Sequence, residues 1–160
     1  MFTLKPALES DVPLLLNFIR ELAEFEKRAQ EVVATEALLR EHFFGAKKCA
    51  DAVIGDLDGQ PVAMGVYFFT ISTFLGQPGL YVEDVYVRPE CRSRGFGKAI
   101  FEHLAYAAVE RGCGRMEWSV LNWNQKAIDF YDRLGGVRID EWRKYRLTGA
   151  ALVKLGASKS

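Results

Sequence analysis

The segment from Leu80 to Leu121 constrains the fold more than any other part of the sequence. It predicts, in this order, a strand, a glycine-rich loop, a helix and a second strand. The strands are predicted at Leu80–Val87 and Arg115–Leu121. Between them, the loop CRSRGFGKAI at Cys91–Ile100 leads into a helix to about Arg111, whose apolar residues recur at helical spacing: Ile100, Leu104 and Ala108. This order predicts a right-handed crossover between parallel strands. We therefore expect an α/β fold with a mixed sheet.

The rest of the chain adds strands and helices on both sides of this crossover. Ser10 is a predicted N-cap, Asp58-Gly59 predicts a hairpin, and Gly135-Gly136 ends the last predicted helix. The tail from Thr148 to Ser160 fits a short helix or a strand. The order is β-α-α-β-β-β-α-β-α-β, and the elements outside the crossover are predicted at Phe2–Lys5, after Ser10, from Thr35 to Gly45, and at Cys49–Leu57, Val62–Thr70, Asn124–Leu134 and Val137–Leu147.

The composition predicts a single domain that covers residues 1–160. Hydrophobic residues make up 49% and charged residues 26% of the chain, which suits one packed core. Lys plus Arg and Asp plus Glu each number 21, so no global field attracts nucleic acid or an anionic membrane. No stretch is long enough to span a bilayer. Three cysteines without a C-x-x-C pair indicate neither a disulfide framework nor a zinc site, so we expect a cytoplasmic protein without a metal.

The glycine-rich loop predicts an anion site. A strand, a loop and a helix N-terminus gather unpaired backbone N–H groups and the positive end of a helix dipole at one place, which suits phosphate. Gly95 and Gly97 would let the main chain approach a ligand closely. The charge could come from Arg92, Arg94 or Lys98. A glycine-rich turn with exposed arginines is the structural alternative.

Two common phosphate motifs do not fit this loop. The dinucleotide pattern G-x-G-x-x-G would need a glycine where Ile100 stands. The Walker pattern would need a glycine in place of Arg92 and a Ser or Thr in place of Ala99. What remains is R-x-x-G-x-G, at Arg92–Gly97, after a strand and before an amphipathic helix.

This motif resembles the pyrophosphate-binding loop of the GCN5-related N-acetyltransferases (GNAT). Three further stretches resemble one branch of that superfamily, the diamine and thialysine N-acetyltransferases, which include the spermidine/spermine acetyltransferases. They are ELAEFEK at Glu21–Lys27, LYVEDVYVRPE at Leu80–Glu90 and LNWNQKAIDFYDRLG at Leu121–Gly135. The resemblance implies a GNAT fold, in which a mixed, mostly antiparallel sheet carries a parallel β-α-β acetyl-CoA-binding core flanked by helices.

The resemblance also implies what the protein does and which residues hold the cosubstrate. It implies direct transfer of an acetyl group from acetyl-CoA to a primary amine of a small molecule, such as thialysine, lysine or a diamine, by a homodimer. The backbone of the Glu83 strand would pair with the pantetheine arm, and the loop amides would hold the diphosphate. The implied acetyl-CoA-binding residues are Val85, Tyr86, Val87, Arg92, Ser93, Arg94, Gly95, Phe96, Gly97, Lys98, Asn124 and Lys126.

Amine acetylation needs a group that accepts a proton from the ammonium and a group that donates one to the leaving thiolate. The resemblance selects Glu83 as the base and Tyr131 as the acid. Strand alternation puts Glu83 and Asp84 on opposite faces, so the two are expected to have different roles. The structural alternatives are solvated edge-strand carboxylates for Glu83 and Asp84, and a core aromatic for Tyr131, which shares helical spacing with apolar neighbours.

The resemblance assigns Phe25 and Glu26 to the amine pocket, with exposed helix-end charge as the alternative for the acid. Polyamine-specific members carry an aspartate ahead of the Glu83 strand, where this chain has Ser72 and Thr73. This difference favours a smaller amine. The three tryptophans, Trp118, Trp123 and Trp142, fit either the pocket or the core.

Two other functions share these features. A sensor could hold acetyl-CoA without catalysis, but it would not need both an acid and a phenol, so Glu83 and Tyr131 favour an enzyme. An acetyltransferase for protein lysines or N-termini would share the core and differ in the acceptor surface.

Overall fold

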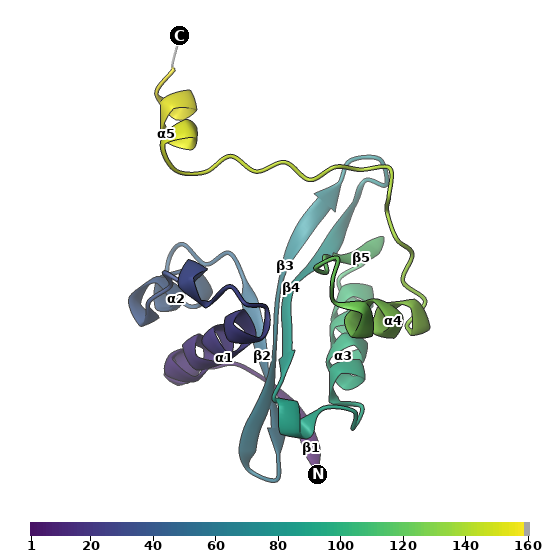
Figure 1. Ribbon diagram of the computed structural model, residues 1–160. Coiled ribbons are helices and arrows are strands. Elements are labelled where there is room, and N and C mark those ends of the chain that lie inside the picture. Colours follow the sequence, from purple (N-terminus) through teal and green to yellow (C-terminus); the bar gives the residue numbers. More distant parts are fainter. Residues whose placement is uncertain (159–160) are drawn as a thin grey trace. The chain divides into compact units, whose positions relative to one another are not determined.

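The computed structural model describes residues 1–158 and divides the chain into two compact units, which meet in the sequence between Leu121 and Asn122. The first unit holds one sheet with the strand order β1-β2-β3-β4-β5 (Figure 1). Three neighbouring pairs are antiparallel and the last, β4 with β5, is parallel, which confirms the predicted mixed sheet. The strands are β1 (Phe2–Pro6), β2 (Asp51–Leu57), β3 (Gln60–Ser72), β4 (Gln77–Val87) and β5 (Arg115–Trp118).

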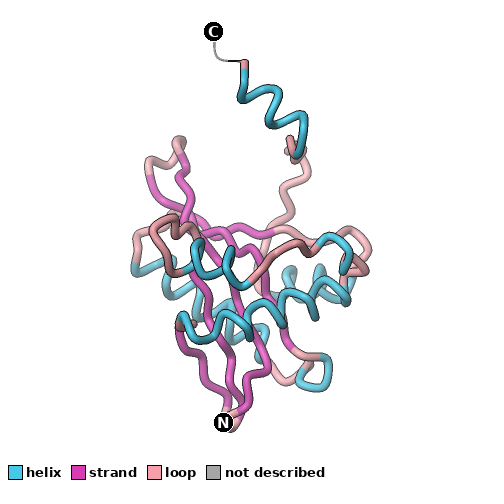
Figure 2. The backbone as a smooth tube through the Cα atoms, turned by 90° about the vertical axis from the view of Figure 1, so that its left-hand side faces the viewer, coloured by secondary structure: helices cyan, strands magenta, loops and turns pink. Residues whose placement is uncertain are grey.

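Helices cover both faces of this sheet. Helices α1 (Val12–Phe25) and α2 (Glu36–Phe43) lie on one face, and α3 (Phe96–Glu110), which connects β4 to β5, lies on the other. Figure 2, seen from the side of α1 and α2, shows these two helices in front of the strands. None of the helices among residues 1–158 is both long and apolar enough to cross a membrane.

Apolar side chains form one layer on each face of the sheet, between the strands and the helices that cover that face. In the layer under α1 and α2, helix and strand side chains pack into one cluster that includes Leu15, Phe18, Ile54, Met64 and Tyr86. The other layer contains the buried α3 residues Ile100, Phe101, Leu104 and Ala108. The predicted helical spacing of the α3 residues is thus confirmed.

Helices α1 and α2 have different residues at their N-terminal caps. Thr35 caps α2, and its Oγ1 accepts a hydrogen bond from the Leu38 amide at 3.3 Å. Ser10 was expected to cap α1, and that expectation is wrong. Residues Glu9–Asp11 form a 3-10 turn, and α1 begins after it with Asp11 in the N-cap position and a proline in its first turn. Since Pro13 lacks an amide hydrogen, it fits where a helix has no internal acceptor for one.

Helix α3 sits close to the sheet at Gly65 of β3. A Cβ built on Gly65 would lie 2.8 Å from Cγ2 of Ile100 and 3.2 Å from Cγ2 of Val53. These distances are shorter than ordinary carbon contacts. The missing side chain therefore sets how closely α3 packs on β3, and with it the position of the loop that enters α3.

The second unit contains α4 (Gln125–Arg133) and α5 (Gly149–Ala157). Asn124 is the N-cap of α4, as predicted, and its Oδ1 accepts a hydrogen bond from the Ala127 amide at 3.3 Å. The prediction of β structure at Val137–Leu147 is wrong for this structure, where these residues form no strand. A strand needs a neighbour for its amides and carbonyls, and no strand pairs with this segment among residues 1–158. The tail is helical at α5, and the last two residues lie outside the described part.

We expect Gly65→Ala to lower the free energy of unfolding by about 1–3 kcal/mol, because the added methyl group must displace α3 or Val53. Gly156→Ala is the matched control, since a Cβ there meets nothing within 4 Å. Urea denaturation of both variants measures the difference. Equal stability of Gly65→Ala and the parent protein would show that α3 does not depend on this close contact.

Candidate active site

The candidate site begins where β4 leaves its regular pairing. The β3–β4 register passes from Val66 opposite Asp84 to Tyr67 opposite Val82, so Glu83 is an extra residue that forms a β-bulge. On its other side, β4 pairs with β5 only from Gly79 to Val82. From Glu83 to Val87, that edge of β4 pairs with no strand in the described chain. This short edge has unpaired backbone groups that a ligand could bind.

The free edge of β4 runs into the glycine-rich loop. Gly95 is the N-cap of α3 and has a left-handed conformation with φ of 84°, which a glycine adopts without steric cost. Ser93 also has a positive φ, of 60°. The Ala99 amide donates to the Gly95 carbonyl, so the amides of residues 96–98 are the first-turn amides that lack a helical acceptor. The predicted order of strand, glycine-rich loop and helix start is therefore confirmed, and anion binding there stays a prediction.

The charged side chains of the loop have protein partners. Arg92 turns towards α1: its Nε donates to the Val87 carbonyl at 2.9 Å, and its guanidinium lies 4.3 Å from the Phe25 ring centroid. Arg94 lies over the Phe96 ring at 5.0 Å, and Lys98 forms an ion pair with Glu102. Phe96 is itself buried and stacks on Phe2 with ring centroids 4.1 Å apart. The backbone amides at the start of α3 are thus the groups of this loop without a helical acceptor, whereas its cationic side chains have protein partners.

Three carboxylates interact around the bulge. Burial, and after it the charges of Glu83 and Glu26, raise the pKa of Asp84 from 3.8 to about 6. The pKa of Glu26 is also raised, mainly by burial, although Arg28 opposes the shift. Glu83 is exposed and Asp84 is half-buried, so the expectation that the two carboxylates have different roles stays a prediction.

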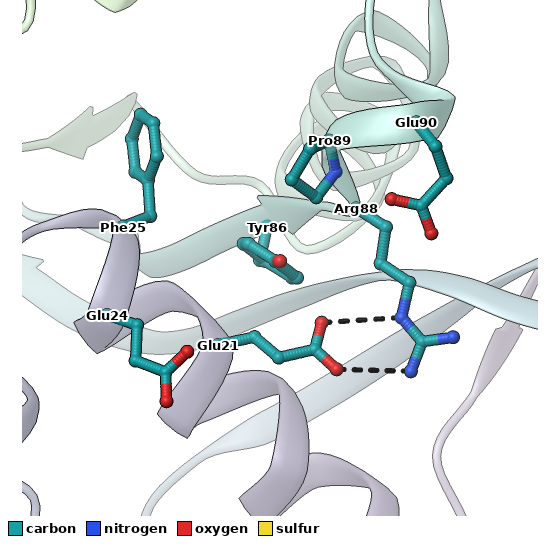
Figure 3. A pocket seen from close by; sticks show the side chains of 7 residues that line it. All are labelled: Glu21, Glu24, Phe25, Tyr86, Arg88, Pro89 and Glu90. Atoms are coloured by element: carbon teal, nitrogen blue, oxygen red, sulfur yellow. Dashed lines mark hydrogen bonds and ion pairs between the residues drawn. The ribbon is translucent and has the colours of Figure 1, made fainter.

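An open pocket of about 520 Å³ lies beside this strand, lined by Glu21, Glu24, Phe25, Tyr86, Arg88, Pro89 and Glu90 (Figure 3). Glu21 and Arg88 form a two-point ion pair: Nε and Nη2 of Arg88 donate to the carboxylate at 3.3 and 3.2 Å. Burial, then a hydrogen bond to Glu21 and its charge, raise the pKa of Tyr86 to about 12, so the phenol is neutral at physiological pH. The pocket therefore combines apolar rings with carboxylates and one guanidinium.

The structure brings some predicted site residues together and keeps others in separate units. Phe25, Glu26, Glu83, Tyr86 and Arg92 belong to the first unit and interact in the groups described above. Lys126 and Tyr131 lie on α4 in the second unit, with Asn124 at its cap, and the Tyr131 ring packs on Phe130 at 5.4 Å between centroids. No group of three His, Cys, Asp or Glu side chains among residues 1–158 is arranged to hold a metal.

Glu21 and Arg88 lie in two of the stretches that resemble the family, but the sequence did not mark either of them as a site residue. Glu21 and Arg88 are 67 positions apart, and their ion pair follows only from the packing of α1 against β4. The bulge at Glu83 has no glycine or other local signal. Ser72 is buried and accepts from the Leu75 amide at 3.3 Å, which gives it a structural role at the β3–β4 turn. Trp118 packs edge-on against Phe101, whereas Trp123 and Trp142 are exposed.

Removing the half-buried charge of Asp84 should make the free energy of unfolding less dependent on pH. Its pKa in the folded protein, about 6, exceeds the ordinary value of 3.8, so the folded state binds the proton more tightly and the ionised group destabilises it as pH rises through this range. We expect Asp84→Asn to gain about 1–2 kcal/mol relative to the parent between pH 4 and pH 8. Urea melts at both pH values test this. Asp132→Asn, at an exposed position of α4, is the control, and an unchanged difference at the two pH values would contradict the assignment.

Comparison with known proteins gives a consistent result. The profile of the Acetyltransferase (GNAT) family matches residues 16–136. A thialysine N-epsilon-acetyltransferase of Sus scrofa is 37% identical over 163 aligned residues, which cover 95% of this chain and 95% of that protein. An L-ornithine N5-acetyltransferase of Arabidopsis thaliana is 31% identical, and the alignment covers 91% of this chain and 84% of that protein.

The solved structures agree in fold. An integron cassette protein from the mobile metagenome of V. cholerae superimposes with a TM-score of 0.83 over 98% of both chains, at 22% sequence identity. An aminoglycoside acetyltransferase from a soil metagenome has a TM-score of 0.77 over 92% of this chain, at 14% identity. These comparisons confirm the predicted fold class and the enzyme class. The free edge of β4, the glycine loop after it and the family profile lead to one conclusion: the chain belongs to the GNAT family of acetyltransferases.

Proposed function

We propose that the protein transfers an acetyl group from acetyl-CoA directly to the primary amine of a basic amino acid. One observation carries the proposal: the unpaired edge of β4 at Glu83–Val87 leads directly into the glycine loop, and the acidic bulge stands at the other end of the same edge. Backbone that can hold a long cosubstrate and carboxylates that can receive an amine are thus parts of one strand.

The residues present fit acetyl-CoA. In the proposal, the backbone of Val85, Tyr86 and Val87 binds the pantetheine arm, and the amides around Gly95 and Gly97 bind the diphosphate. Ser93, Arg94, Phe96 and Lys98 shape the loop, while Arg92, held by the Val87 carbonyl, fixes its first residue. Asn124 and Lys126 are also among the residues that we propose to bind acetyl-CoA. The bound cosubstrate supplies an acetyl thioester.

The side chains of this protein then carry out the two proton transfers of the reaction, one from the ammonium and one to the thiolate. The carboxylates of Glu26, Glu83 and Asp84 attract the ammonium form of the acceptor. Glu83 accepts the proton, directly or through water, so that the neutral amine can attack the acetyl carbon. Tyr131 donates a proton from its phenol to the departing thiolate.

The acceptor follows from the pocket at α1 and β4. Phe25 and Tyr86 offer apolar walls for a methylene chain, and Glu24 and Glu90 offer charge for an ammonium group. Arg88 uses Nε and Nη2 towards Glu21, which leaves Nη1 for a substrate carboxylate. A basic amino acid carries all three features. The relatives named for thialysine and L-ornithine, which are both amino acids, support this class.

Three further proposals concern the domain organisation, the oligomeric state and the location of the protein. We propose that residues 1–160 form one N-acetyltransferase domain, because the family profile extends across the boundary between the two units. We further propose a homodimer, as in the family branch that the sequence resembles, and a cytoplasmic location, which suits three cysteines without disulfides.

Coenzyme A release, followed with a thiol reagent, tests the proposed reaction on acceptor pairs that differ only in the α-carboxylate: lysine with cadaverine, and ornithine with putrescine. We expect the amino acids to give a kcat/KM about tenfold or more higher, because Arg88 pairs with their carboxylate. Arg88→Gln should remove this preference and Glu21→Gln should keep it. Equal rates within both pairs would contradict the amino acid assignment, and no release in protein that binds acetyl-CoA would contradict catalysis on this class.

Loss of the Tyr131 hydroxyl should slow the reaction without weakening cosubstrate binding. We expect Tyr131→Phe to lower kcat about 100-fold or more while the Kd for acetyl-CoA stays within about twofold. Phe130→Leu changes the neighbouring ring on the same helix and serves as the control for packing. A Tyr131→Phe protein with the parent kcat would exclude the phenol as the proton donor.

Loss of the Glu83 carboxylate should affect the rate most at low pH. We expect Glu83→Gln to lower kcat/KM about 100-fold near pH 7 and progressively less towards pH 10, because more of the amine then arrives deprotonated. The pH profile of kcat/KM for both proteins measures this. Parallel profiles would show that Glu83 does not accept the proton.

A further inference from the structure

The first strand reaches the glycine-rich loop through two stacked phenylalanine rings. Phe2 lies on β1, and Phe96 is the first residue of α3. Their ring centroids are 4.1 Å apart, and the ring planes differ by only 6°. Phe96 is 9% exposed, and it is the only buried residue between positions 92 and 97. The one buried side chain of this part of the loop thus packs on β1.

Phe2 has room for its ring because β2 carries a glycine beside it. A Cβ built on Gly55 would lie 2.7 Å from Cζ and 2.8 Å from Cε2 of Phe2. These distances are shorter than ordinary carbon contacts. In the β1–β2 register, Phe2 lies opposite Leu57 and Leu4 lies opposite Gly55, so the ring crosses β2 on the diagonal. Phe2 is therefore held between the backbone of Gly55 and the ring of Phe96.

The backbone on both sides of Phe2 is fixed to the β2–β3 hairpin. Before it, the Met1 carbonyl accepts a hydrogen bond from the Asp58 amide at 3.2 Å. After it, Thr3 pairs with Asp56 of β2. The first residues of a domain are often loose unless contacts of this kind hold them. The stack on Phe96 thus starts from an ordered strand.

The position of Phe96 matters because its own amide is part of the candidate anion site. The amides of residues 96–98 have no helical acceptor, and that of Phe96 is the first of them. Ser93, earlier in the same loop, has a positive φ of 60°, and such a conformation persists only where the surroundings hold it. A contact that fixes the Phe96 side chain therefore also limits the direction of the first amides of α3.

We propose that Phe2 is a positioning residue for acetyl-CoA: its ring holds Phe96, and with it the first amides of α3, in the arrangement that binds the diphosphate. Hydrogen bonds weaken steeply when their angles deviate, so a small shift of this turn lowers the affinity. The inference rests on the proposed binding of acetyl-CoA at the loop. It adds to the site a residue of β1, which lies outside the stretches that resemble the family. Phe2 acts on binding and not on the proton transfers.

Calorimetric titration with acetyl-CoA, in the absence of an acceptor, tests the inference on the full chain. We expect Phe2→Leu and Phe2→Met to raise the Kd about three- to tenfold, because both keep an apolar side chain and remove the stacked ring. Coenzyme A should show the same factor, since it has the same diphosphate. Leu4→Ala, which shortens another partly buried side chain of β1, is the control and should leave the Kd within about twofold. An unchanged Kd in both Phe2 variants would overturn the inference.

A double-mutant cycle shows whether Phe2 acts through Phe96. Phe96→Leu alone should also raise the Kd for acetyl-CoA. Adding Phe2→Leu to it should then change the Kd by less than about twofold, because the stack is already lost. If the two changes raise the Kd independently of each other, Phe2 does not position Phe96 and the inference is wrong.

Steady-state kinetics separate this role from a loss of folded protein. We expect Phe2→Leu to raise the KM for acetyl-CoA by the factor seen in the Kd, while kcat at saturating acetyl-CoA stays within about twofold. A variant that only unfolds more readily would lower kcat and keep KM, and that result would overturn the inference. A parent protein that binds acetyl-CoA but releases no coenzyme A would contradict the proposed reaction, while the Kd values still decide the role of Phe2. A parent protein that does not bind acetyl-CoA would contradict both.

Discussion

The parallel pairing between β4 and β5 stops at Val82, one residue before the bulge at Glu83, and the rest of the candidate site depends on that limit. Up to Val82 the backbones of β4 and β5 pair with each other. After Val82 the backbone of β4 has a free edge, and the same strand leads into the glycine loop and α3. Close packing of α3 on Gly65 of β3 then fixes the helix end whose first-turn amides face the loop. A backbone-lined site of this kind needs few specific side chains.

The electrostatics of the site work against the stability of the fold. Asp84 is half-buried with Glu83 and Glu26 nearby, and this arrangement raises the pKa of Asp84 to about 6. Keeping such a carboxylate costs folding free energy at neutral pH. In contrast, Glu21 is neutralised by the two-point ion pair with Arg88, and Arg92 is held by the Val87 carbonyl and the Phe25 ring. The site thus separates uncompensated acids at the bulge from compensated charges near the loop, which suits an acceptor with an amine at one end and a carboxylate at the other.

Local patterns predicted the elements that local chemistry determines. The hairpin at Asp58-Gly59, the helix that starts after Thr35, the crossover through α3 and the cap at Asn124 are all encoded within a few residues. The bulge at Glu83 and the pairing of Glu21 with Arg88 depend on contacts between distant segments, so no window of the sequence contains them. The expected strand at Val137–Leu147 shows the same limit, because a strand pattern in the sequence does not specify a partner strand. Motifs identified the family, while the pocket lining required the packed structure.

Amide hydrogen exchange with and without acetyl-CoA tests the central claim most directly, because the claim concerns backbone groups. The account predicts that the cosubstrate slows exchange in two peptides of the chain, Glu83–Val87 on the free edge of β4 and Gly95–Lys98 at the start of α3, and that coenzyme A without the acetyl group does so too. Acetate should protect neither peptide. Binding of acetyl-CoA that leaves both peptides unprotected would place the cosubstrate elsewhere and contradict the account.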